Sequence, residues 1–137
     1  MIGARLDVAL MALRIASASA FLYHGSGILF GAFGGPGPRA FADSHGWPVA
    51  VASLVGLAQV FGAVAVLTGT FARLGAVCLI VVMIGAILLV HLPHGFDVSN
   101  GGFEYALTQM LVATAILLAG PGRYSVARLL PEPWSLL

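Results

Sequence analysis

Long apolar runs alternate with short polar stretches along the chain. The runs cover residues 8–30, 49–67, 72–92 and 103–119. Because a helix needs about 20 largely apolar residues to cross about 30 Å of hydrocarbon, the pattern predicts four membrane-spanning helices. It therefore indicates an all-α integral membrane protein, an antiparallel four-helix bundle forming a single domain over residues 1–137. Gly69 and Arg73 mark a very short turn, so the second and third runs are predicted to be antiparallel neighbours.

The polar stretches between the runs have their own signals. The first loop, Gly31 to Pro48, contains the sequence GAFGGPGP, whose glycines and prolines predict a loop without regular helix. Trp47, just before the second run, suits the membrane–water interface. Residues 120–137 are predicted to form a cytoplasmic tail. Within it, Tyr124 to Leu130 is expected to lie along the surface as an amphipathic turn or two.

Composition supports a lipid-facing exterior. Hydrophobic residues make up 60% of the 137 residues and charged residues only 8%, against about 25% in typical soluble domains. The net charge is +1 and there is no basic tract, so nucleic acid is not an expected partner. The single cysteine, Cys78, cannot form an intrachain disulfide or a CxxC pair and is expected to be a small buried residue.

Arginine positions predict the orientation in the cell membrane. Four spans place both termini on one side, which collects five of the six basic residues and is therefore predicted to be cytoplasmic. All four histidines and three of the five acids then fall on the opposite side. The sequence thus predicts that any chemistry lies at the non-cytoplasmic face. The residues at that face are His24, His45, His91, His94, Asp43, Asp97 and Glu104.

A polar stripe runs along the first predicted helix. Arg14, Ser17, Phe21 and His24 are spaced by 3, 4 and 3 positions and share one helical face. Because polar groups in hydrocarbon are costly, this stripe is expected to face the bundle. Arg14 either snorkels to the interface or has a buried structural or ligand-lining role. His24 is either satisfied by backbone or available to a ligand.

In the second helix, Gln59 is the strongly polar side chain near the middle, and glycines lie one turn to either side. It predicts either an interhelical hydrogen bond or a donor to a quinone carbonyl.

The stretch HLPHGFDVSNGGFEYAL, from His91 to Leu107, is the densest group of candidate residues. His91 and His94 can handle protons or bind a polar ligand, and a solvated loop without a role is the alternative. An HxxH pair beside an acid can also hold zinc, copper or iron, but neither metal nor haem is the expected cofactor. Glu104 either complements the helix dipole or meets His24 or His91, and Tyr105 pairs with Gln109 one turn on.

Several stretches together resemble the DoxX family of small four-helix membrane proteins. They are LRIASASAFLYHG, FGGPG, HLPHGF, GGFEYAL and GPGRYSV, and the resemblance extends from about Leu13 to Leu130. It implies a link to a thiosulfate:quinone oxidoreductase, whose related membrane subunit works with quinone, and to partners of sulfur- or superoxide-handling enzymes in oxidative stress. Many members have no assigned activity. Polar positions of the family pattern are occupied here by Arg14, His24, His91, His94, Glu104 and Tyr105.

The leading hypothesis is a redox-associated membrane subunit that binds a quinone or similar lipid-soluble ligand near the outer leaflet. His24, His91 and Glu104 would bind it or move its protons, and Gln59 and Arg14 would line the pocket more deeply. A partner redox protein would supply electrons, so whether the chain itself is an enzyme stays open. The alternatives are a non-catalytic anchor or scaffold for a partner enzyme, and a small transporter or metal-binding membrane protein acting as an oligomer.

Overall fold

The structure is a computed structural model that describes residues 2–131, and its regular structure is entirely helical within that range. The α-helices are α1 Ile2–Phe30, α2 Gly37–His45, α3 Val49–Thr68, α4 Ala72–Ala86 and α5 Glu104–Ala119. Short turns of other helix types are η1 Ala32–Gly34, η2 Ile87–His91, η3 Leu92–His94, η4 Val98–Asn100 and η5 Val126–Leu129. The predicted all-α class is confirmed. Residues 132–137 of the predicted tail lie outside the described residues.

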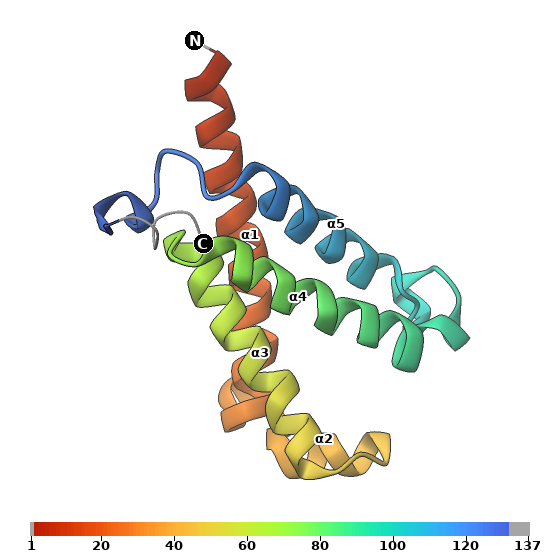
Figure 1. The fold of residues 1–137 in the computed structure, drawn as a ribbon. Helices are drawn as coiled ribbons and strands as arrows, with labels where there is room; N and C mark the ends of the chain where they lie inside the picture. The colour runs from red at the N-terminus through yellow and green to blue at the C-terminus, as the bar shows by residue number, and fades with distance from the viewer. Residues whose placement is uncertain (1, 132–137) are drawn as a thin grey trace.

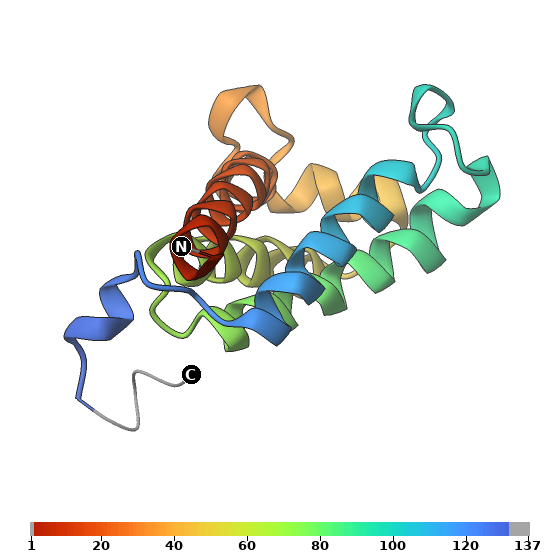
Figure 2. The ribbon, with the colours of Figure 1, turned by 90° about the horizontal axis from the view of Figure 1, so that it is seen from above.

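The four longest helices pack side by side in the order α1, α3, α4 and α5. α3 lies against both α1 and α4, and α4 lies against α5, whereas α1 and α5 meet over a smaller area. The α1–α3 pair and the α4–α5 pair diverge away from the end that carries the N-terminus (Figure 1). Seen from above, the tail after α5 runs close to the start of α1 (Figure 2). A regular four-helix bundle is not confirmed, because α2 is an additional helix and the pairs diverge.

Three helical segments are long and apolar enough to cross a membrane: Gly3–Phe30, Val49–Thr68 and Ala72–His94. They agree with the first three predicted spans, and the chain is a membrane protein on this pattern. The fourth predicted span corresponds to α5, which is apolar but has 16 residues. At 1.5 Å per residue α5 is about 24 Å long, which is shorter than the hydrocarbon layer of about 30 Å.

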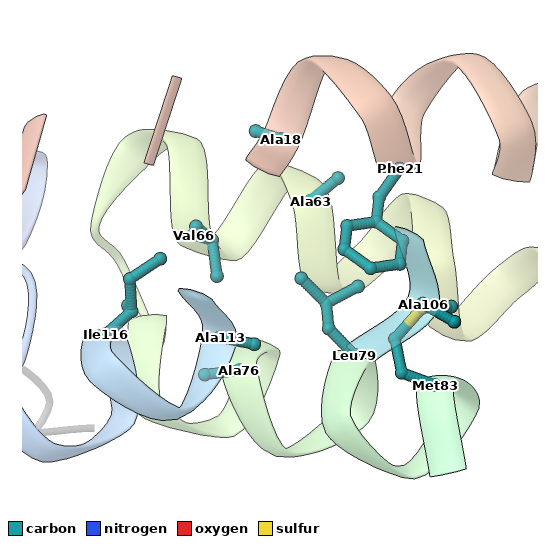
Figure 3. Packing of buried hydrophobic residues seen from close by; sticks show 10 residues of the cluster. All are labelled: Ala18, Phe21, Ala63, Val66, Ala76, Leu79, Met83, Ala106, Ala113 and Ile116. Atoms are coloured by element: carbon teal, nitrogen blue, oxygen red, sulfur yellow. The ribbon is translucent and has the colours of Figure 1, made fainter. Parts of the chain in front are cut away.

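The core is built from small residues where the helices approach most closely. Ala18, Ala63, Ala76 and Ala113 are fully buried, and larger side chains such as Leu79 fill the remaining space (Figure 3). Large aliphatic side chains instead point outward, as expected of a surface in contact with lipid. Glycines allow the backbones of α3 and α4 to approach closely. A Cβ on Gly75 would lie 2.9 Å from the Gly62 carbonyl oxygen.

The first loop contains a helix that the sequence analysis did not predict. The expectation of a loop without regular helix over residues 31–48 is wrong for α2. Pro36 precedes this helix and Pro38 lies in its first turn, where a proline is tolerated because its missing N–H has no intrahelical partner there. Gly46 ends α2 in the left-handed conformation, with φ of 67°. The chain then passes through Trp47 and Pro48 into α3.

The end of α4 also departs from simple helix geometry. The regular α-helix stops at Ala86 and continues as the π turn η2 before the 3-10 turn η3, which contains Pro93. Pro93 lacks an N–H and its ring crowds the carbonyl four residues earlier, which explains why α-helical pairing is lost ahead of it. In the tail, the predicted surface turn corresponds to the single 3-10 turn η5.

Candidate functional site

His24 and Tyr105 bring an imidazole and a phenol together from different helix pairs. His24 lies in α1, Tyr105 lies in the first turn of α5, and their ring centroids are 6.3 Å apart with an interplanar angle of 59°. Tyr23 meets His24 edge-on, with centroids 5.3 Å apart. His24 is exposed and Tyr105 is 42% exposed, so both rings are accessible at the protein surface. The structure therefore places two of the predicted site residues next to each other.

Gln59 lies behind this pair, on α3. It is 5% exposed, and its side chain packs on the backbone of α1 at Gly25, the residue after His24. The contact requires glycine, because a Cβ on Gly25 would lie 2.7 Å from the Gln59 Cβ. Among residues 2–131 no hydrogen bond of the Gln59 amide is formed, so the predicted interhelical hydrogen bond is not made within the described chain. The amide stays available to a ligand.

Two aromatic residues extend the His24–Tyr105 pair and were not singled out from the sequence. Tyr23 stacks on Phe33 with centroids 5.3 Å apart and an interplanar angle of 20°. Phe33 occupies a left-handed backbone conformation, with φ of 55°, in the turn η1. No sequence signal points to this conformation in a phenylalanine, since glycine and asparagine are the residues that usually adopt it. The stack continues the row of rings from α1 onto η1.

His91 and His94 are held by local backbone contacts after α4. The Nδ1 atom of His91 is 2.7 Å from the Gly101 carbonyl oxygen, and that of His94 is 3.1 Å from the Val90 carbonyl oxygen. Because a carbonyl oxygen can only accept, Nδ1 carries the proton in both rings. Each Nε2 is therefore left available for another partner. Among residues 2–131 no three His, Cys, Asp or Glu side chains are grouped as metal ligands.

Glu104, the first residue of α5, contacts the same loop. Its Oε2 accepts a hydrogen bond from the backbone N–H of Val98 at 3.2 Å, rather than one from either histidine proposed as its partner. Nearby, Asp97 accepts hydrogen bonds from the N–H and hydroxyl of Ser99 at 2.8 and 2.7 Å. These bonds stabilise the charged form and lower the pKa of the exposed Asp97 carboxyl. Hydrogen bonds accepted by Glu104 and Asp97 thus stabilise the conformation of this loop.

Arg14 lies at the other end of the molecule, ten residues before His24 on α1, or about 15 Å along the helix axis. It is 3% exposed and its guanidinium donates four hydrogen bonds. The acceptors are the carbonyls of Val66 at 2.7 Å, Leu67 at 2.6 Å, Pro121 at 2.7 Å and Tyr124 at 2.7 Å. We call these five residues the Arg14 network. Of the alternatives for Arg14, this geometry supports the buried structural role over snorkelling to water.

Comparison with known proteins identifies the family. Residues 9–92, more than half of the chain, match the DoxX family. The chain belongs to the DoxX family. No curated protein and no solved structure was found to match it. The family match confirms the resemblance seen in the sequence. It includes Arg14, His24, Gln59 and His91 and ends before His94, Glu104 and Tyr105.

In this DoxX-family protein the predicted site residues therefore fall into three groups. His24 and Tyr105 form an exposed pair with Gln59 behind it. His91, His94 and Glu104 lie in or beside the loop between α4 and α5, and Arg14 belongs to a separate structural network. The first group has the largest variety of groups that can contact a ligand. It offers N–H and O–H donors beside aromatic faces, next to apolar helices, which suits a flat ring that carries carbonyl oxygens.

Proposed function

We propose that this DoxX-family protein is a membrane subunit that binds a quinone, or a similar lipid-soluble ring ligand, at His24 and Tyr105. The observation that carries the proposal is the 6.3 Å approach of these two rings from α1 and α5. An imidazole N–H and a phenol O–H at that spacing can both donate to carbonyl oxygens of one ligand. The edge of Tyr23 adds an aromatic contact, and Gln59 adds an amide on the inner side.

Quinone chemistry explains why a histidine is useful at this position. Reducing a quinone to a quinol takes two electrons and two protons, and imidazole exchanges protons near neutral pH. His24, protonated on both ring nitrogens, would give one proton to a quinone oxygen and, after taking a proton from water, would give the second. His91 and the exposed His94 would exchange protons with water. The electrons would come from a partner redox protein that docks on this subunit.

A binding titration tests this function. A short-chain ubiquinone added to the protein in mild detergent is expected to bind wild type, and His24→Ala and Tyr105→Phe are each expected to weaken binding roughly fivefold, the value of one hydrogen bond of about 1 kcal/mol. The double variant should lose roughly 25-fold if the two bonds are independent. His45→Ala is the matched control, since His45 bonds to Phe41 within α2.

Unchanged affinity in the double variant would contradict the proposal. In that case a non-catalytic anchor for a partner enzyme becomes the better assignment. The exposed Phe96 and Val98 in the loop after α4 favour this second candidate, because they present apolar side chains at the surface. Its signature is a stoichiometric partner protein that co-purifies in mild detergent and is retained by the double variant.

We also propose that α1, α3, α4 and α5 all cross the bilayer, with both termini in the cytoplasm of the cell. The arginines near the N-terminus, near the α3–α4 turn and after α5 support this orientation. In a Cys78→Ala background, Ser44→Cys on α2 is expected to react with a membrane-impermeant maleimide added to intact cells. Arg5→Cys is expected to react only after the cells are opened. The reverse labelling pattern would show the opposite orientation.

A further inference from the structure

A groove lies at the end of the molecule opposite to His24, between the last turn of α3 and the tail. Its volume is about 630 Å³, and both polar and apolar residues line it. The polar lining includes Arg14, Ser125 and Arg128, and the apolar lining is formed by Leu67, Val126 and Leu129. Neither the quinone proposal nor the family match gives this groove a role.

Arg14 brings an unbalanced positive charge to the groove. A guanidinium has five N–H donors, and the Arg14 network uses one on Nε, two on Nη1 and one on Nη2. One N–H on Nη2 is therefore left over. All four acceptors are neutral carbonyls, and no carboxylate of the described chain pairs with Arg14. Because a buried charge without a counterion is costly, an anion beside Nη2 would be favoured there.

Two further groups in the groove suit the same anion. The Ser125 hydroxyl oxygen is buried and has no hydrogen-bond partner among the described residues. Arg128 lies on η5 and is exposed, so its guanidinium is free to move toward a ligand. The remaining N–H of Arg14, the paired N–H donors of Arg128 and the Ser125 hydroxyl together match the oxygens of a phosphate.

The apolar lining of the groove and its position at the end of α3 indicate that the phosphate belongs to a lipid. Arg14 contacts the last turn of α3, so the groove lies where that membrane segment ends. Leu129 is 84% exposed, and Val126 and Leu67 also present apolar surface beside it. We propose that this groove binds the phosphate group of an anionic phospholipid, whose acyl chains run along these three side chains into the bilayer.

Native mass spectrometry of the full chain in neutral detergent tests the proposal. Wild type is expected to retain phosphatidylglycerol in preference to phosphatidylcholine with the same acyl chains. Arg128→Gln and Ser125→Ala are each expected to reduce retention of phosphatidylglycerol about fivefold, the value of one lost hydrogen bond. Arg5→Gln is the matched control, because Arg5 is exposed on α1 at the same end of the molecule. This substitution removes the same charge as Arg128→Gln. Its retention should equal that of wild type.

Several results would overturn the assignment. Equal retention of the two lipids would remove the anionic preference, and equal losses in Arg5→Gln and Arg128→Gln would indicate diffuse charge attraction instead of a site. Displacement of the lipid by millimolar inorganic phosphate would assign the groove to free phosphate. The melting temperature of each variant without added lipid should match wild type, so that loss of lipid cannot reflect unfolding. Quinone affinity should be unaffected in all three variants.

Discussion

Replacing Arg14 by methionine removes all four hydrogen bonds of the Arg14 network while keeping a long side chain in the same space. The carbonyls of Val66 and Leu67 belong to the last turn of α3, where a helix has no intrahelical donors left for its carbonyl groups. An unsatisfied buried polar group costs about 1–3 kcal/mol. The carbonyls of Pro121 and Tyr124 lie in the tail, where water can reach them more easily.

The expected loss in the free energy of unfolding is therefore about 2–5 kcal/mol for Arg14→Met, which is within the range of a broken buried polar network. Arg14→Lys should lose less, because it keeps a donor and the charge but cannot reach four acceptors from one nitrogen. Arg5→Met is the matched control on the same helix. As an exposed residue, Arg5 should change stability by no more than about 0.5 kcal/mol.

The assay is unfolding in mixed micelles of dodecyl maltoside with increasing dodecyl sulfate, followed by circular dichroism. A loss below about 1 kcal/mol in Arg14→Met, together with an unchanged transition in Arg14→Lys, would contradict a stabilising role of the Arg14 network. It would mean that other donors satisfy the end of α3 and that the four bonds add little to what water provides.

Two further predictions use features at other positions. Gly25→Ala should destabilise by about 1–3 kcal/mol in the same assay, because its Cβ would lie 2.7 Å from the Gln59 Cβ. Gly85→Ala should be neutral or stabilise by up to about 1 kcal/mol, since nothing lies within 4 Å of the added Cβ; equal effects of the two would contradict this. Asp97 has a lowered pKa, so its contribution to loop order should be complete above about pH 4 and be lost as the pH falls through the folded-state pKa. The protection of the Ser99 amide, which is its exchange rate compared with the intrinsic rate at the same pH, should fall over that range in wild type but not in Asp97→Asn; unchanged protection in wild type would contradict the prediction.

The long helices could be predicted because a segment that crosses the bilayer has to be both long and apolar. A run of about 20 apolar residues is long enough to span the bilayer, and residues 2–131 contain three helical segments of this length. The sequence did not predict α2 because the effect of glycine and proline on a helix depends on where in the helix they lie. Glycine and proline disfavour helix in its interior, but Pro38 and Gly37 lie in the first turn of α2, where their penalties are small.

The candidate site was harder to predict, since it depends on contacts between distant segments. The sequence suggested that His24 could meet Glu104, whereas the structure brings it to the next residue, Tyr105. One residue turns a helix by about 100°, so the helical periodicity of α5 alone could not decide which of the two faces α1. For Arg14 the sequence left three roles open. The buried structural role is supported by hydrogen bonds to Pro121 and Tyr124, which lie 107 and 110 positions further along the chain.

Those separations also affect how the chain is made. Arg14 enters the membrane with the first helix, but its acceptor at Tyr124 is synthesised 110 residues later. At about 5–20 residues per second, the ribosome needs roughly 5 to 20 s to cover that distance. The acceptors on α3, Val66 and Leu67, are made first, and those after α5 follow later. The segment that follows α5 thus completes the polar contacts of the first helix only after all the long helices have been synthesised.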